Sequence, residues 1–216
     1  MPNDNYIQEK LTFFLKHSFM AHHEAGHCIL SLLHFMRVNY TRIYQVEIGP
    51  EAETEYDSIF EYKEFNDPEL FNYEVHSEIS MLYAGSAAER ILYKNISGSD
   101  VFPNILKEGS WEDNKKAYNL IINHINIKPG KERSLYKKNI IKETIKTLID
   151  NWNDIELIAH ALFKKKKLFY KDLKKILTTK SKNKDFWKDQ LRSIDFIFKK
   201  QNKIAAHDLK VILGIG

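Results

Sequence analysis

The chain has 216 residues, of which 43% are hydrophobic and 29% are charged, and its formal net charge is +4. These values are ordinary for a soluble globular protein, and the length is enough for one domain with a sizeable core and a short appendage. The lysine-rich runs, such as Lys164 to Lys167, fit solvated helix faces better than a nucleic-acid surface, so we expect no nucleic-acid partner.

Cysteine content and hydropathy bear on the cellular compartment. The only cysteine, Cys28, cannot form an internal disulfide, which fits a reducing compartment. No stretch approaches the roughly 18 consecutive apolar residues of a membrane span, and the N-terminus lacks a basic segment followed by an apolar one. We therefore expect a cytoplasmic protein without a membrane span.

The first predicted elements are helical and carry a metal-binding motif. Residues 6 to 17 are predicted to form a helix that leads into a second one, because apolar residues recur at helical spacing on both sides of the stretch Ala21 to His27. In that stretch His23 and His27 are one turn apart on the same face and can bind one metal ion. Glu24 lies beside that face, where a carboxylate can take a proton from a metal-activated water. This pattern indicates a zinc-dependent hydrolase, most often a peptidase.

Three neighbours of the motif have simpler interpretations. A glycine inside a helix costs on the order of 1 kcal/mol against alanine, so we expect Gly26 to let another backbone come close. His22 is five residues from His27 and lies off the metal-binding face, and Cys28 points away from that face as well. We expect His22 to be an ordinary polar or packing residue and Cys28 to be a small buried core residue.

A small β element is predicted after the metal-binding helix. Val38 to Ile48 alternates apolar and polar residues and is followed by Gly49-Pro50, which predicts a strand and then a turn. A second strand is predicted from Ser58 to Phe65, with an acidic loop from Glu51 to Asp57 between the two. We expect this loop to lie near the cleft and to favour basic or unfolded polar segments, although a solvated turn is the simpler alternative.

The rest of the chain is predicted to be helical. Asp67 and Pro68 are typical of an N-cap and a first helical residue, and the helix they open is predicted to run to about Lys94. It contains the small-residue patch Gly85 to Ala88, where another helix could pack closely. After a loop over residues 95 to 109, further helices are predicted from Ser110 to Pro129-Gly130, from Ser134 to about Lys166, from Tyr170 to Leu177 and from Trp187 to Phe198.

The polar stretch from Thr178 to Lys184 lacks core residues and marks the best boundary in the chain. We predict a mainly α fold with a small two- or three-stranded β element after the metal-binding helix. Residues 1 to 177 are predicted to be a metallopeptidase-like domain, and residues 178 to 216 a short linker and a C-terminal helical extension.

Several segments together resemble the protease domain of FtsH-type zinc metallopeptidases. The matching segments are Ala21 to His27, Met81 to Leu92, Gly109 to Ala117 and, more weakly, Ile155 to Leu177, in the order that the family has them. The resemblance implies a helical peptidase domain in which His23, His27 and Asp113 bind zinc and Glu24 is the general base. The family normally carries an ATP-driven unfoldase module, but this sequence has no G-x-x-x-x-G-K-[ST] phosphate loop, so ATP-independent activity is expected.

From the residues alone, two carboxylates compete for the third metal position. Glu89 follows the small-residue patch in its helix, which is how gluzincins supply their third ligand, but it could be a paired surface carboxylate. Asp113 fits the capping pattern that begins at Ser110, which is worth on the order of 1 kcal/mol to a helix. The resemblance favours Asp113 as the ligand and leaves Glu89 as a supporting or packing carboxylate.

Three functions remain open. The leading hypothesis is an ATP-independent zinc metalloendopeptidase acting on peptides or unfolded proteins. The second is a regulatory zincin that cleaves a repressor-type protein. The third is a non-catalytic, zinc-stabilised subunit that docks on a separate unfoldase, and in each case oligomers are possible.

Overall fold

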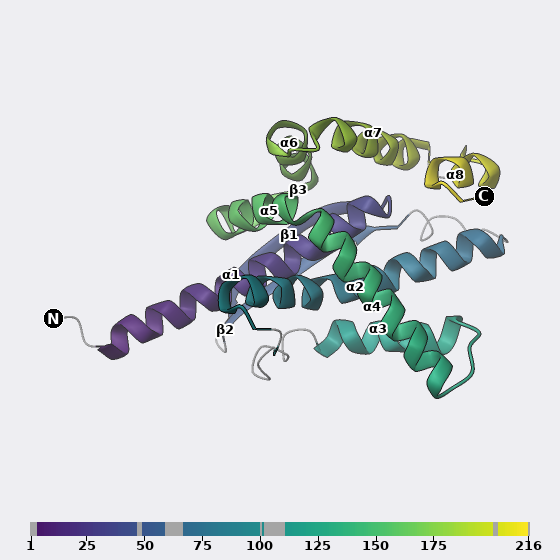
Figure 1. Ribbon diagram of the computed structural model, residues 1–216. Helices are drawn as coiled ribbons and strands as arrows, with labels where there is room; N and C mark the ends of the chain where they lie inside the picture. The colour runs from purple at the N-terminus through teal and green to yellow at the C-terminus, as the bar shows by residue number, and fades with distance from the viewer. Residues whose placement is uncertain are drawn as a thin grey trace.

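Two long helices, α1 (Asp4–Leu33) and α2 (Pro68–Ser97), form the centre of the fold. They pack side by side and run in opposite directions (Figure 1). A Cβ atom added to Gly26 of α1 would lie only 2.8 Å from the carbonyl oxygen of Ala84 in α2. The same Cβ atom would lie 3.0 Å from Cβ of Ala88 in the small-residue patch, so the close approach expected at Gly26 and at this patch is confirmed.

Six further helices and three strands surround this pair in the part of the chain that the structure describes. A computed structural model describes residues 4–46, 49–58, 67–99, 101, 111–200 and 203–215. The predicted mainly α fold with a small β element is confirmed. Besides α1 and α2, the elements are β1 (Arg37–Val46), β2 (Gly49–Asp57), α3 (Trp111–His124), α4 (Lys131–Asp150), α5 (Trp152–Lys165), β3 (Lys167–Phe169), α6 (Tyr170–Lys180), α7 (Lys184–Lys200) and α8 (Ala206–Leu213). None of the helices in these ranges combines the length and apolar character that crossing a membrane requires.

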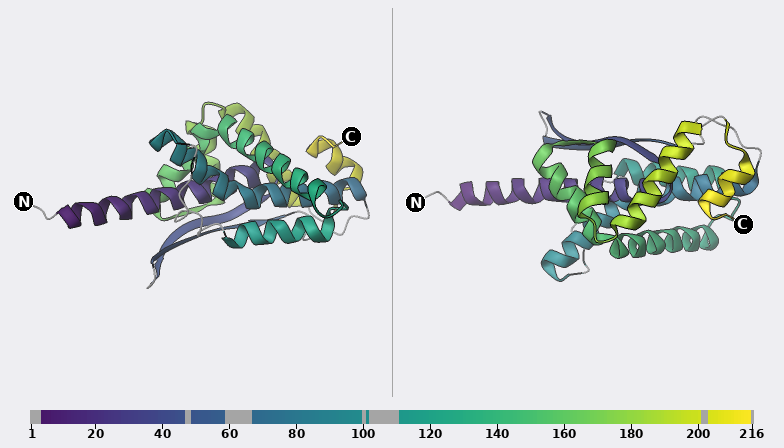
Figure 2. Two further views of the ribbon diagram at one scale, coloured as in Figure 1. Left: turned by 60° about the horizontal axis from the view of Figure 1, so that its bottom comes forward. Right: turned by 90° about the horizontal axis from the view of Figure 1, so that it is seen from above.

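The sheet is antiparallel, has the strand order β2-β1-β3, and packs against α1. Strand β1 pairs with the whole of β2 and, from Tyr40 to Arg42, with β3. Thr41 and Ile43 of β1 are buried on the inner face, whereas Tyr40 and Arg42 alternate with them on the outer face, as the two-residue period of a strand requires. Strand β2 is left as an edge of the described sheet (Figure 2).

Strand β2 corrects the prediction for the acidic segment. Residues 51 to 57 are not a loop but part of a strand that pairs with β1. The acidic residues occupy every second position, so they share the outer face, where Glu53 accepts hydrogen bonds from Tyr40 Oη and Arg42 Nε. The other predicted strand does not include Ser58, which follows the end of β2, and its residues 59 to 65 lie outside the described residues.

The start of α2 confirms the predicted cap. Asp67 Oδ1 accepts hydrogen bonds from the backbone N–H groups of Glu69 at 3.0 Å and Leu70 at 3.2 Å, and Pro68 is the first helical residue. The helix extends three residues beyond the predicted end and stops before Gly98, whose φ of 69° is in the left-handed region that favours glycine. Residues 102 to 110, which include most of the predicted loop and Ser110, lie outside the described residues.

The single helix predicted from residue 134 to 166 is wrong, because the structure has two helices with a break at Asn151. Asn151 has non-helical angles, φ −111° and ψ 17°, and its side-chain Nδ2 donates to the carbonyl oxygen of Thr147 at 2.9 Å. Asparagine side chains compete with the helical backbone for such carbonyls, so the apolar period continues across a point where the backbone does not.

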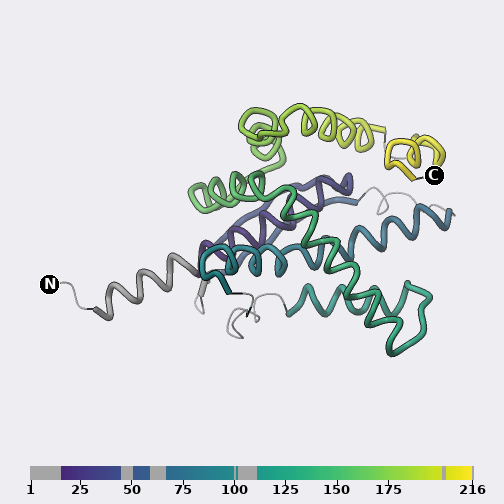
Figure 3. The backbone as a smooth tube through the Cα atoms, in the orientation of Figure 1, coloured from purple at the N-terminus to yellow at the C-terminus, as the bar shows by residue number. Residues whose placement is uncertain are grey.

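The C-terminal helices dock on the rest of the molecule. Gln190 of α7 donates from Nε2 to the carbonyl oxygens of Leu32 at 2.8 Å and Leu33 at 3.2 Å, which are groups that the end of α1 leaves without helical partners. Trp187 is fully buried, and its Nε1 donates to Asp154 Oδ2 at 2.7 Å. Helix α8 lies beside the start of α2, where Lys210 forms ion pairs with the cap (Figure 3).

Candidate metal centre and cleft

His23 and His27 of α1 and Asp113 of α3 converge on one point. One ligand atom from each residue lies within 4.8 Å of the other two. Oδ2 of Asp113 is 3.3 Å from Nε2 of His23 and 3.3 Å from Nε2 of His27. Both histidines are buried, and α3 presents Asp113 from its first turn, as the sequence predicted. Among the described residues this is the group that could hold a metal ion.

Hydrogen bonds fix the orientation of both imidazole rings. His27 Nδ1 donates to the carbonyl oxygen of Met81 at 2.8 Å, and His23 Nδ1 donates to Glu89 Oε1 at 3.1 Å. Both partners are acceptors, so a ring in its neutral, metal-binding form carries its proton on Nδ1 and keeps the Nε2 lone pair, on the side of Asp113, for a metal ion. Histidine ligands of metals are commonly oriented in this way by a carboxylate or a carbonyl behind the ring.

The electrostatics of the group suit a cation. Burial works against the charge on Asp113, but its contacts with His23 and His27 hold the pKa of this carboxyl well below its usual range. Burial likewise opposes a charge on His23, yet its hydrogen bonds to Asp113 and Glu89 raise the pKa of the ring well above its usual value. Glu89 is buried, and its Oε2 lacks a hydrogen-bond partner in the described structure. The two carboxylates beside one imidazole thus create a site that stabilises a positive charge.

Gly85 forms the wall of the site on the α2 side. A Cβ atom at this position would lie 2.3 Å from His23 Nε2 and 2.5 Å from two carbon atoms of the same ring. Any side chain at position 85 would therefore displace the ring whose Nε2 faces Asp113. The predicted small-residue patch contributes to the site as well as to helix packing.

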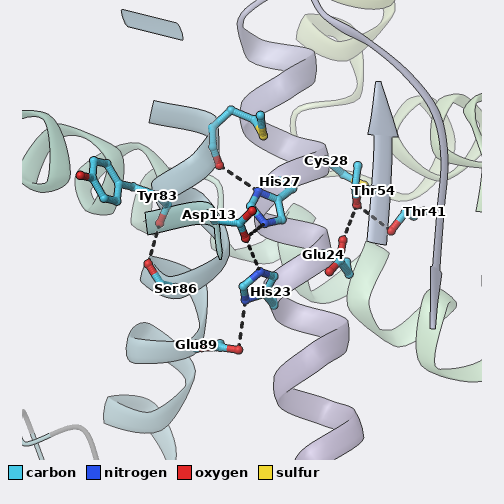
Figure 4. Close-up of polar contacts among 11 residues, drawn as sticks. His23, Glu24, His27, Cys28, Thr41, Thr54, Tyr83, Ser86, Glu89 and Asp113 are labelled. Atoms are coloured by element: carbon cyan, nitrogen blue, oxygen red, sulfur yellow. Dashed lines mark hydrogen bonds and ion pairs between the residues drawn. The ribbon is translucent and has the colours of Figure 1, made fainter. Parts of the chain in front are cut away.

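Glu24 lies on a different face of α1 from the two histidines. The close-up shows α1 between α2 and β2, with His23 and His27 directed towards Asp113 and Glu24 directed towards the sheet (Figure 4). Its carboxylate is buried, and Oε2 accepts a hydrogen bond from Thr54 Oγ1 of β2 at 2.6 Å. Sequence reasoning missed Thr54 because its segment was predicted as an acidic loop, in which a threonine carries no signal.

The two neighbouring residues are outside the metal group, as the sequence predicted. His22 stacks on Trp152 with ring centroids 5.6 Å apart, its Nδ1 donates to the carbonyl oxygen of Ser18, and burial lowers its pKa. Cys28 is fully buried, and burial together with the charge of Glu24 raises the pKa of its thiol to about 12. A thiol with such a pKa is inert as a nucleophile or ligand near neutral pH.

His23, Glu24, His27 and Asp113 line an open cleft of about 1060 Å³ bounded by α1, α2, β2 and the start of α3. The edge strand contributes Glu51 to Thr54 and Tyr56 to its lining, and Trp111, with 69% of its surface exposed, lies on the α3 side. Carboxylates outnumber lysines in the lining. The arrangement can bind a cation, hold a buried carboxylate beside it and admit an extended chain from solvent.

Comparison with known proteins adds no family to this description. No protein-family model matches the chain, and no curated protein matches its sequence.

Proposed function

We propose that this chain is a zinc-dependent metalloendopeptidase. The observation that carries the proposal is the convergence of His23, His27 and Asp113 beside the buried carboxylate of Glu24 in an open cleft. Two imidazoles and one carboxylate leave one position of a tetrahedral zinc ion for water or substrate, which is the composition of catalytic rather than structural zinc sites. The resemblance of the motif segments to FtsH-type peptidases supports the same assignment.

Zinc bound by His23, His27 and Asp113 would polarise the peptide carbonyl and lower the pKa of a coordinated water. Glu24 takes a proton from the attacking water as its oxygen forms a bond to the carbonyl carbon. Glu24 then gives this proton to the amide nitrogen as the carbon–nitrogen bond breaks, so that a carboxylic acid and an amine leave. The Met81 carbonyl oxygen and Glu89 keep the two imidazole rings oriented through both steps.

The shape of the cleft favours peptide substrates. Strand β2 is an edge of the described sheet and lines the cleft beside the metal group. An extended peptide can add to an exposed sheet edge through main-chain hydrogen bonds, which places successive amides along the strand. Since this chain carries no phosphate loop, we propose that flexible peptides are cleaved without ATP and that folded proteins are poor substrates.

The buried base is what separates hydrolysis from other uses of the same donor set. Two imidazoles and one carboxylate also suit iron(II) in oxygenases, and a zinc-stabilised docking subunit needs the metal ligands alone. Neither use requires a buried carboxylate next to the first histidine. The metal bound by the purified protein should therefore be identified together with its activity.

The decisive test is digestion of a peptide library with and without chelator, using wild-type protein and Glu24→Gln. We expect cleavage that chelator abolishes and zinc restores. Glu24→Gln should keep stoichiometric zinc and lose about 100-fold or more of turnover, since general base catalysis typically contributes 10²–10⁴-fold. Glu143→Gln, which changes an exposed carboxylate on α4, serves as the matched control and should have wild-type turnover. Zinc-loaded wild-type protein that cleaves no peptide would instead favour the non-catalytic subunit.

A further inference from the structure

Thr54 is the residue that holds the proposed general base. Its Oγ1 lies 2.6 Å from Glu24 Oε2, and residue Glu24 is only 4% exposed. An ionised carboxylate has no proton to donate, so the hydroxyl of Thr54 is the donor in this contact. Hydrogen bonds to an ionised acceptor are roughly twice as strong as neutral ones, and burial shields this one from competing water.

A second threonine lies behind the first. Thr41 of β1 is the cross-strand partner of Thr54 in β2, and their hydroxyl oxygens are 2.9 Å apart. A hydroxyl has only one proton to donate. Because Thr54 donates its proton in the hydrogen bond to Glu24, the hydroxyl of Thr41 is the donor to Thr54 Oγ1. Thr41 is fully buried. The two paired strands thus supply a short chain of hydrogen bonds that ends on one carboxylate oxygen.

The position of this contact matters because the side chain of Glu24 and those of the proposed metal ligands project from different faces of α1. His23 and His27 are directed towards α2 and Asp113, whereas Glu24 and Cys28 are directed towards β2 (Figure 4). A glutamate has three rotatable side-chain bonds, and proton transfer needs its free oxygen within about 3 Å of the reacting water. With Oε2 held by Thr54, Oε1 is the oxygen left for that transfer.

We infer that Thr54 is a positioning residue for Glu24, an inference that rests on the proposed peptidase function. It fixes the carboxylate in one orientation, and Thr41 in turn fixes the hydroxyl of Thr54. Because Thr54 belongs to the strand that lines the cleft, the same strand that would bind an extended substrate also orients the base.

Kinetics of three variants test the inference. Thr54→Val keeps the shape of the side chain and removes the hydroxyl, so kcat should fall roughly 10- to 100-fold while KM and zinc affinity stay within about twofold. Thr54→Ser restores the hydroxyl and should regain most of kcat. Thr144→Val removes a buried threonine hydroxyl on α4 that has no hydrogen-bond partner among the described residues, and it should leave kcat unchanged. A Thr54→Val enzyme with wild-type kcat, or a loss that Thr54→Ser does not restore, overturns the inference.

A double-mutant cycle in protein stability tests the contact between Thr54 and Glu24 without an activity measurement. Urea unfolding of the zinc-free protein is compared for wild type, Thr54→Val, Glu24→Ala and the double variant. Thr54→Val should lower the unfolding midpoint in the wild-type background and shift it much less in the Glu24→Ala background. Equal shifts in both backgrounds would show that Thr54 acts independently of Glu24 and would overturn the inference. If wild-type protein cleaved no peptide but the cycle showed coupling, the proposed function would fail while the contact stood.

Discussion

Asp113 and Glu89 approach opposite nitrogens of the His23 ring, and this geometry assigns them different work. Asp113 Oδ2 is 3.3 Å from Nε2 of both His23 and His27, whereas Glu89 Oε1 is 3.1 Å from His23 Nδ1. A metal ion near Nε2 is therefore within reach of Asp113, and Glu89 orients the ring from behind.

Zinc affinity of Asp113→Asn and Glu89→Gln, measured side by side by competition with a chelating dye, checks this assignment. Loss of a carboxylate that orients a ligand typically costs about 10- to 100-fold in metal affinity, and we expect this range for Glu89→Gln. Asp113→Asn removes the proposed third ligand and should cost more. A Glu89→Gln protein that loses zinc while Asp113→Asn retains it would make Glu89 the ligand.

Gly85 offers a test in which helix stability and metal binding change in opposite directions. Alanine is favoured over glycine in a helix by about 1 kcal/mol, so Gly85→Ala should stabilise α2 locally. The new Cβ would nevertheless lie 2.3 Å from His23 Nε2 and displace the ring. We expect at least about a tenfold loss of zinc affinity without loss of helical circular dichroism. Ser86→Ala, one position along the same helix, is the control, and equal zinc affinity in the two variants would contradict the role of Gly85.

Some of the candidate site residues could be predicted from the sequence and others could not, for a physical reason. His23, Glu24 and His27 are related by the helical period, which a sequence displays directly. Asp113 is 86 residues beyond His27, and only the folding of α3 against α2 brings it to the site, so the resemblance to a known family was needed to name it. Thr54 had neither a local period nor a motif to mark it.

At the scale of elements, β2 shows how one pattern supports two interpretations. Gly49-Pro50 and a high charge density are typical of a loop, and this interpretation was wrong. The same residues have a two-residue period: Glu51, Glu53 and Glu55 face outward, while Ala52 and Thr54 face α1. Pairing with β1 decided the outcome, because the Tyr40, Arg42 and Tyr44 side chains of that strand bind the carboxylates. Cross-strand partners are not adjacent in sequence, so local propensity could not predict them.

The predicted preference for basic substrates can be tested at β2. Glu51 and Glu53 line the cleft; Glu53 forms an ion pair with Arg42, whereas Glu51 accepts a hydrogen bond from the uncharged Tyr44 hydroxyl. Replacing both by glutamine should lower turnover of lysine-rich peptides by about two- to fivefold relative to acidic ones, and added salt should reduce the difference. The control replaces Glu55 and Asp57, which belong to the same strand but do not line the cleft. An equal loss for both peptide classes would mean that the charges serve the strand and not the substrate.

At the scale of the whole molecule, the end of α1 is in contact with segments that are distant in the sequence. Gln190 of α7 donates hydrogen bonds to the last carbonyl oxygens of α1. His34, the first residue after α1, lies beside Ser77 of α2, with 3.1 Å between His34 Nδ1 and Ser77 Oγ. Burial, reinforced by the nearby His76, lowers the pKa of His34 to about 4. The helix that carries the proposed metal ligands is therefore anchored at a junction that contains a neutral histidine.

This junction predicts a loss of stability in mild acid. The unfolded chain takes up a proton on His34 near its ordinary pKa of about 6.5, whereas the folded protein resists protonation until about pH 4. The contribution of His34 is thus complete above pH 6.5 and falls as the pH drops towards 4, by on the order of 2 kcal/mol for a partly buried ring. Urea unfolding of zinc-free wild type and His34→Gln between pH 7 and 4.5 isolates this contribution, because His23 and His27 are common to both proteins. The variant should lose less stability on acidification, while His124→Gln, an exposed histidine at the end of α3, should follow wild type. Parallel curves for wild type and His34→Gln would show that the histidine at this junction is protonated as easily in the folded protein as in the unfolded chain.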